Sequence, residues 1–190
     1  MKPIQGYDLV NEAGEFKQLP AGIYGVKITN VVDVPEKEYL EVYCDITKGE
    51  YANYFKTAVE NGLRDTSRCI RSYKTNALAF FKAFITAVEK TNPGYHWDWD
   101  EQKLIGKNVI AVFGVEEYIG ADGTLKTSVK VQEFRSLEAF QQNKITVPEV
   151  RKVTEEDWQK WRSLHESVAS AEPETVSVET PALDTFELPF

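Results

Sequence analysis

Residues 39–46, YLEVYCDI, alternate strictly between two kinds of side chain. Leu40, Val42, Cys44 and Ile46 fall on one side of an extended chain, and Tyr39, Glu41, Tyr43 and Asp45 fall on the other. A period of two places successive side chains on opposite faces of a β-strand, so one face of this strand meets a hydrophobic core. The segment therefore predicts a half-buried strand and constrains the chain to a fold with a substantial β-sheet.

Further strand-like segments surround one helix-like segment. Strands are predicted at 22–34, 51–56, 106–118 and 124–135, and a helix at 75–90. The turn GADG at 120–123 joins the last two strands into a hairpin. Apolar residues at helical spacing define the helix, and Pro93 and Gly94 end it. Residues 57–74 are polar, and no element is predicted there.

Three strands, a helix and two strands form the order of a five-stranded OB-type barrel, in which the helix between strands 3 and 4 closes one end. Small mixed β-domains of other topology share this order. We assign residues 1–153 to the barrel domain and 154–168 to a short amphipathic helix with Thr154 as its N-cap. Residues 169–190 lack periodicity and are predicted to be a flexible acidic tail.

The charge is unevenly divided along the chain. Residues 1–153 carry 20 Lys and Arg against 21 Asp and Glu, whereas residues 154–190 carry 2 against 9. Within the first part, residues 56–90 hold seven basic and three acidic side chains. A near-neutral body with a local basic segment can meet a polyanion, which a uniformly acidic body would repel.

Several exposed aromatic and basic side chains are candidate DNA contacts. If Val129 and Val131 face the core, then Lys126, Lys130 and Phe134 share the outer face of the last strand, with Arg135 adjacent. The full set of candidates is Tyr39, Tyr43, Arg64, Arg68, Arg71, Lys74, Lys126, Lys130, Phe134 and Arg135. Aromatic faces stack on bases and cations bind phosphates without reading sequence. The competing interpretation is that these aromatic rings cover a second layer of the protein, such as the C-terminal helix.

The arginines at 64, 68 and 71 are spaced so that a helical turn would align them on one side, and in a loop they would still line a groove. In YHWDWDE, residues 95–101, Trp97 and Trp99 lie on one side of an extended stretch with acids between them. Those acids would repel a DNA backbone, so core or lid packing is the favoured role of both tryptophans.

The residue types favour a non-catalytic protein without cofactor or metal. Two cysteines outside any CxxC pair fit a reducing compartment, and two histidines far apart are too few for a zinc site. Asp98, Asp100 and Glu101, or Glu116 and Glu117, would be the carboxylates of a Mg²⁺-dependent nuclease, but no recognisable basic or histidine partner accompanies them. No leader and no run of about 18 apolar residues is present, which favours a cytoplasmic protein that does not contact membranes.

Several sequence segments, in the same order along the chain, resemble those of a known protein family. YLEVYCDITKGEYANYF, FITAVEKTNPGYHWDWDE, KLIGKNVIAVFGVEEY and KTSVKVQEFRSLEAF followed by KITVPEV resemble single-stranded DNA-binding proteins of phages and mobile elements of Gram-positive bacteria. The resemblance covers roughly residues 20–150. It implies an OB-fold that coats single strands without sequence preference in DNA replication, recombination or repair, in the cytoplasm of a bacterial host if the protein is phage-encoded.

The C-terminus, ETPALDTFELPF, resembles the tail tip of bacterial single-stranded DNA-binding proteins. A terminal ring that also carries the free carboxylate can fill a pocket with a basic group at its rim. The residues of this tip are Asp184, Phe186, Glu187, Leu188, Pro189 and Phe190. The likeness implies that the tip binds replication or recombination proteins, although its two acids are separated where the usual tip has consecutive aspartates.

The sequence therefore predicts a non-sequence-specific single-stranded DNA-binding protein that recruits partners through its C-terminal tip. One barrel covers only a few nucleotides, so a homo-oligomer is compatible with this function, and the sequence leaves the oligomeric state open. The alternatives are a Mg²⁺-dependent nuclease or nuclease subunit, and a phage structural β-protein.

Overall fold

The computed structural model describes residues 2–3, 5 and 17–169. The chain divides into two compact units, Met1–Lys152 and Val153–Phe190.

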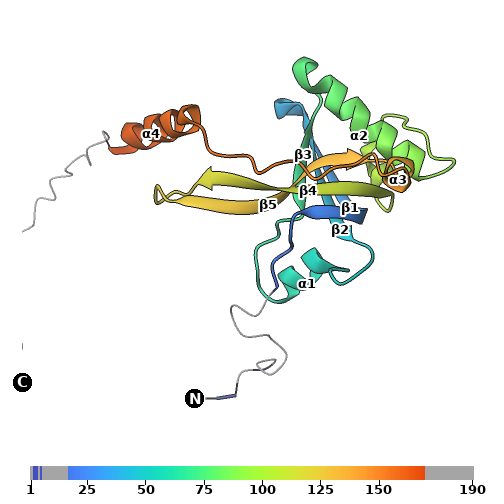
Figure 1. Cartoon of the computed structure of the whole chain (residues 1–190), viewed down its shortest axis with the longest axis horizontal. Helices are drawn as coiled ribbons and strands as arrows, with labels where there is room; N and C mark the ends of the chain where they lie inside the picture. Colours follow the sequence, from blue (N-terminus) through green and yellow to red (C-terminus); the bar gives the residue numbers. More distant parts are fainter. Residues whose placement is uncertain (1, 4, 6–16, 170–190) are drawn as a thin grey trace, which may run out of the picture. The chain divides into compact units, whose positions relative to one another are not determined.

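The first unit is built on one antiparallel sheet of five strands (Figure 1). The strands are β1 (Gly22–Val34), β2 (Tyr39–Ile46), β3 (Arg68–Ser72), β4 (Asn108–Ile119) and β5 (Leu125–Arg135). Their order in the sheet is β3-β2-β1-β4-β5, so β3 and β5 are its two edges and do not pair with each other. The mainly β fold predicted from the sequence is confirmed, and its five-stranded sheet is open rather than closed into a barrel.

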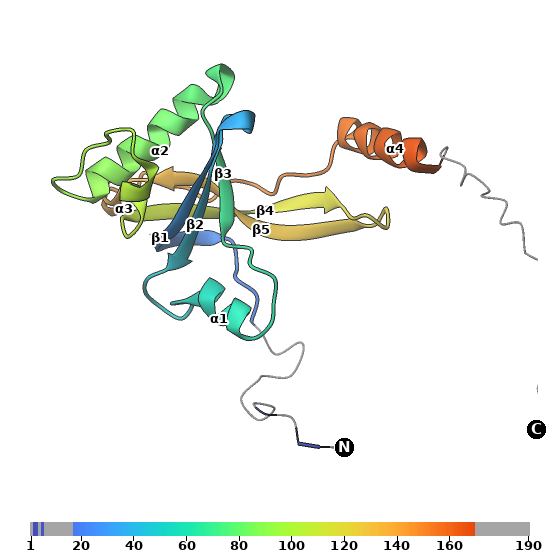
Figure 2. The same cartoon turned by 180° about the vertical axis from the view of Figure 1, so that it is seen from behind.

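Strand β1 is shared between two neighbours. Its first half, from Gly22 to Lys27, pairs with β4, and its second half, from Val26 to Val34, pairs with β2. A bulge between Ile28 and Asn30 interrupts the pairing with β2. Bulges bend a strand and increase its twist. The two halves of β1 therefore belong to two differently directed parts of the sheet, which Figures 1 and 2 show crossing each other.

The core lies on one face of this bent sheet. Its central residues are Val26 and Ile28 of β1, Leu40, Val42 and Cys44 of β2, and Val109, Ala111 and Phe113 of β4. These are the alternate residues that the strand pattern predicts. Cys44 and Cys69 are free and buried in this core, and burial raises the pKa of the Cys69 thiol to about 11. Both cysteines therefore act as small apolar core residues.

The helix predicted at 75–90 is present. A 3₁₀ turn, η3 (Thr75–Ala77), leads into α2 (Leu78–Thr91), whose Phe81, Phe84, Ile85, Ala87 and Val88 are buried. It contacts β3, β4 and β5, and α1 (Tyr54–Glu60) lies at the opposite end of the sheet (Figures 1 and 2). Two further 3₁₀ turns are η2 (Pro35–Lys37) and η4 (Glu101–Leu104), and α3 (Leu137–Gln141) follows β5.

The predicted strand at 51–56 is wrong, because Tyr54–Glu60 forms helix α1. The carboxylate of Asp45, on β2, accepts hydrogen bonds from the backbone N–H groups of Phe55 (3.1 Å) and Lys56 (3.0 Å). These are donors in the first turn that a helix leaves without partners. A side chain from another element thus stabilises the start of the helix, and no local pattern could reveal that.

The third strand is instead β3, within the polar stretch where no element was predicted. Its core-facing residues are Cys69 and Arg71, which pair with Val42 and Leu40 of β2. Because one of these two inward residues is an arginine, the strand lacks the apolar alternation by which strands are recognised.

The second unit contains α4 (Glu155–Ala169), the helix predicted at 154–168. The N–H of Asp157 donates to Thr154 Oγ1 (3.3 Å), and the N–H of Thr154 donates to Asp157 Oδ2 (3.1 Å). This reciprocal pair is a capping box with aspartate in place of the usual glutamate. Trp161 stacks on His165 with ring centroids 4.2 Å apart.

Candidate nucleic-acid interface

The outer face of β2 and β3 carries two of the predicted aromatic contacts. Tyr39, Glu41 and Tyr43 point away from the core, and their partners on β3 are Ser72, Ile70 and Arg68 in turn. We call Tyr39, Glu41, Tyr43, Arg68 and Ile70 the β2–β3 face. Both tyrosines are half-buried, and Ile70 is 46% exposed. The face therefore combines two rings, an exposed aliphatic side chain and a cation.

Glu41 lies at the centre of the β2–β3 face and binds two of its neighbours. The Arg68 guanidinium donates to Glu41 Oε1 (2.7 Å), and the Tyr43 hydroxyl donates to Glu41 Oε2 (3.0 Å). Partial burial, and then the hydrogen bond to the Glu41 carboxylate, raise the pKa of Tyr43. Glu41 thus fixes the positions of the ring and the guanidinium, and its negative charge offsets that of Arg68.

The two lysines predicted on the last strand lie on the β4–β5 hairpin. Lys126 pairs with Asp122 (2.9 Å) and Lys130 with Glu116 (3.4 Å), so both ammonium groups have carboxylate partners. The hairpin continues beyond Phe113, where the pairing of β4 with β1 ends. Lys130 lies opposite Gly114 there, whereas Tyr43 lies opposite Asn30 near the other end of β1.

The eight residue-to-residue steps from Gly22 to Asn30 correspond to about 26 Å measured along an extended strand. The structure therefore does not bring Lys126 and Lys130 next to Tyr39 and Tyr43.

Phe134 was predicted on the outer face, and that placement is wrong because its side chain is buried in the core, only 6% exposed. Val112 of β4 pairs with Glu133 while Phe113 pairs with Val131, so Gln132 is an extra residue on β5. The bulge reverses the in-out alternation of the residues that follow it. Phe134 consequently shares the core side with Val129 and Val131.

Arg71 also lies on the core side, where it bridges the open edges of the sheet. Its guanidinium carbon is 4.6 Å from the centroid of the Phe134 ring, which itself packs 4.8 Å from that of Phe84. A guanidinium over an aromatic face is an attractive cation–π contact. The edges β3 and β5, which do not pair, therefore touch through these two side chains.

The remaining predicted cations lie apart. Arg64 is exposed in the connection before β3, and Lys74 is exposed directly after it, at the start of η3. Arg135 donates to its neighbour Glu133 (2.8 Å). The three arginines do not align on one side of a helix, because Arg68 and Arg71 lie on opposite faces of β3.

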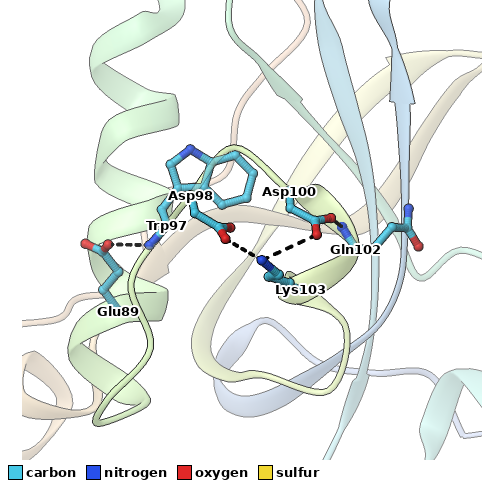
Figure 3. Close-up of polar contacts among 6 residues, drawn as sticks. All are labelled: Glu89, Trp97, Asp98, Asp100, Gln102 and Lys103. Atoms are coloured by element: carbon cyan, nitrogen blue, oxygen red, sulfur yellow. Dashed lines mark hydrogen bonds and ion pairs between the residues drawn. The ribbon is translucent and has the colours of Figure 1, made fainter.

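Three of the five acids considered for a nuclease are engaged in ion pairs. Lys103 binds both Asp98 and Asp100 (Figure 3), and Glu116 binds Lys130. Across residues 17–169, no three Asp, Glu, His or Cys side chains gather into a group that could hold a metal ion.

Two contributors to the β2–β3 face, Ile70 and Glu41, were not predicted from the sequence. Ile70 stands in the segment where no strand was predicted. Glu41 was visible as the middle residue between Tyr39 and Tyr43, so the alternation of 39–46 already placed it beside both rings. Its pairing with Arg68 depends on the register of β3 and could not be read from the sequence.

The C-terminal tip, from Asp184 to Phe190, lies outside the described residues. None of the helices within the described ranges is long and apolar enough to cross a membrane.

No family model matches this sequence, and a search of curated proteins found no match.

Proposed function

We propose that the protein is a non-catalytic, non-sequence-specific single-stranded DNA-binding protein and that the strand lies on the β2–β3 face. The observation that carries this proposal is the position of Tyr39, Tyr43 and Arg68 on one open sheet face, opposite the core. Rings that stack on bases, next to cations that bind phosphates, are the components of sequence-independent binding to single strands.

We further propose that the fold is a partly open barrel of the OB type. Three features support this assignment: the meander β1-β2-β3, a helix before β4, and a β1 that pairs with both β2 and β4. OB-folds bind oligonucleotides on the face of strands 2 and 3. In this chain that is the face on which Tyr39 and Tyr43 lie.

The chemistry of binding follows from the side chains. Each tyrosine offers a flat ring, and base–aromatic stacking stabilises by about 1–3 kcal/mol per base for any base. Arg68 is the first residue of β3, and two more exposed cations flank this strand in the sequence, Arg64 before it and Lys74 after it. Phosphates following β3 would therefore meet positive charge at three points, which adds affinity without sequence preference.

The C-terminal tip extends the proposal to recruitment. Phe190 combines a ring with the chain's terminal carboxylate, Leu188 and Phe186 supply further apolar anchors, and Pro189 restricts the backbone before binding. We propose that this tip binds proteins of DNA replication or recombination, on the strength of the sequence alone.

The test is a titration of fluorescently labelled dT oligonucleotide followed by anisotropy. Tyr39→Ala and Tyr43→Ala should each weaken binding about 5- to 150-fold, the equivalent of one lost stacking contact. The matched control is Phe80→Ala, which removes an exposed ring (76% exposed) from α2. Thermal unfolding of each variant establishes that it is folded at the temperature of the titration.

Two further arms test the class of function. Duplex of the same length should bind much more weakly than dT at the same salt concentration, and equal affinity would contradict the proposal. Incubation of the labelled strand with the protein and Mg²⁺ should leave its length unchanged, whereas shortening would favour a nuclease.

A further inference from the structure

Both the exposure and the backbone conformation of Trp99 are unfavourable for folding. Its side chain is 83% exposed and its backbone φ is +68°. A bulky residue with positive φ is a conformational outlier, because its Cβ crowds the following carbonyl. An indole in water also gains nothing from the hydrophobic effect. The prediction that Trp99 packs in the core or under a lid is therefore wrong, and its exposure requires another explanation.

The loop around Trp99 is held by polar contacts from both sides (Figure 3). The Lys103 ammonium binds Asp98, which precedes Trp99, and lies 3.6 Å from Asp100, which follows it. The hydrogen bond from Lys103 lowers the pKa of Asp98, so this carboxyl stays charged at neutral pH. A loop ordered before binding loses little entropy when a partner arrives.

The start of the same loop is fixed to α2. The N–H of Trp97 donates to Glu89 Oε1 (2.8 Å), and the N–H of Gln102 donates to Asp100 Oδ1 (3.1 Å). The backbone on each side of Trp99 is thus tied down, and the indole is the part left in solvent.

Trp99 forms one wall of an apolar groove of about 690 Å³ between this loop and α2. The apolar residues lining it are Leu40, Tyr73, Leu78, Phe81, Ile85, Trp97 and Trp99. Ring centroids are 6.1 Å apart between Trp97 and Trp99 and 6.4 Å apart between Phe81 and Trp97. Leu78 is 51% exposed. Aromatic side chains around an apolar pocket are typical of the points that dominate protein–protein affinity.

The charged residues around the groove determine whether it attracts a positively or a negatively charged partner. Asp33, Glu89 and Glu101 line it, against one cation, Lys82. Such a rim repels a nucleic-acid backbone and attracts a cationic segment. The β2–β3 face does not have this excess of negative charge, because its charged residues are one carboxylate, Glu41, and one arginine, Arg68.

We propose that this groove, which we call the Trp99 groove, binds a segment of a partner protein that carries aliphatic or aromatic side chains beside Lys or Arg. The apolar side chains of that segment fill the space between Trp99 and α2, and its cations lie along the acidic rim. This site is separate from the proposed DNA face and does not depend on it.

The experiment measures anisotropy of a labelled 14-residue peptide of leucine and lysine at helical spacing, titrated with the full chain. Saturable binding that Trp99→Ala weakens about 10-fold or more, with Phe80→Ala unchanged, supports the proposal. Equal binding by wild type and Trp99→Ala overturns it, and so does equal or tighter binding of the matching leucine–glutamate peptide.

Two charge-reversal variants distinguish binding in the groove from general attraction of the lysine peptide to an acidic protein. Glu101→Lys at the rim should weaken the lysine peptide about 2- to 5-fold at low salt. Glu138→Lys on α3 makes the same charge change at a carboxylate that, like Glu101, accepts a hydrogen bond from a glutamine side chain. Equal loss in both variants overturns the proposal. The proposal is also overturned if dT displaces the peptide from wild type but not from the Tyr39→Ala, Tyr43→Ala double variant. Such a result would place the peptide on the β2–β3 face instead of in the groove.

Discussion

At the scale of single residues, Glu41 determines how strongly the β2–β3 face can attract a phosphate. Its carboxylate holds the Arg68 guanidinium and the Tyr43 hydroxyl together, and its side chain is only 15% exposed. A hydrogen-bonded ion pair positions both side chains, but the acid also competes with any phosphate for the guanidinium. Glu41 therefore orders the side chains of the β2–β3 face but reduces the positive charge that the face offers to a phosphate.

Replacing Glu41 by Gln should tighten binding to dT about 3- to 10-fold at low salt, because Arg68 becomes free for one more phosphate. One more neutralised phosphate steepens the dependence of log affinity on log salt by about 0.7 for a single strand. Anisotropy titrations at several salt concentrations measure both effects. Glu60→Gln, which removes a carboxylate paired with Lys56 on α1, is the control and should change neither. An unchanged slope for Glu41→Gln would count against Arg68 as a phosphate contact.

The backbone at Trp99 allows a second test at this scale. Glycine has no Cβ to crowd the chain at φ +68°, so Trp99→Gly should be more stable than Trp99→Ala by about 1 kcal/mol. At Lys82, an exposed position within α2, the order should reverse, because glycine weakens a helix by about 1 kcal/mol relative to alanine. Denaturant unfolding measures both pairs. A less stable glycine variant at 99 would show that this position is not strained.

At the scale of elements, the bulge in β5 decides which residues the hairpin gives to the core. Without Gln132 as an extra residue, Phe134 would point outward and the space between Phe84 and Arg71 would be empty. With it, Phe134 closes the gap between two strands that share no ladder. Packing across this gap replaces the hydrogen bonds that a closed barrel would have between β3 and β5.

Phe134→Ala should accordingly destabilise the protein by about 3–5 kcal/mol, the usual cost of removing a buried phenylalanine ring. A ring on the outer face would cost far less, so denaturant unfolding distinguishes the two placements. Phe140→Ala on α3, where the ring is 44% exposed, is the control and should have a smaller effect. Equal effects of the two substitutions would contradict the packing described for Phe134.

These elements also show what the sequence could and could not predict. The alternation of 39–46 placed Tyr39 and Tyr43 outward, and the helix at 75–90 followed from its spacing, because both patterns are local. Helix α1 depends on a hydrogen bond to Asp45, which lies on strand β2. Strand β3 has an arginine among its core-facing residues, and the bulge at Gln132 reverses which residues of β5 face the core. Each of these three features is a tertiary contact or an irregularity without a local sequence signal.

At the scale of the whole molecule, the first unit offers two surfaces of different character. The β2–β3 face carries tyrosines and Arg68, and the Trp99 groove carries apolar side chains with an acidic rim. Single-stranded DNA fits the first and is repelled by the second, whereas a basic segment of a partner fits the second. The two proposed activities can therefore be separated by substitutions.

Photo-crosslinking with an oligonucleotide that carries 5-iododeoxyuridine, followed by mass spectrometry of the attached peptides, tests the position of the strand most directly. Stacked aromatic residues are the ones that such a base reaches. We predict that the crosslinks map to Tyr39 and Tyr43 on β2. Crosslinks confined to Trp99, or to Tyr118 on the β4–β5 hairpin, with none on β2, would contradict the proposal that DNA lies on the β2–β3 face.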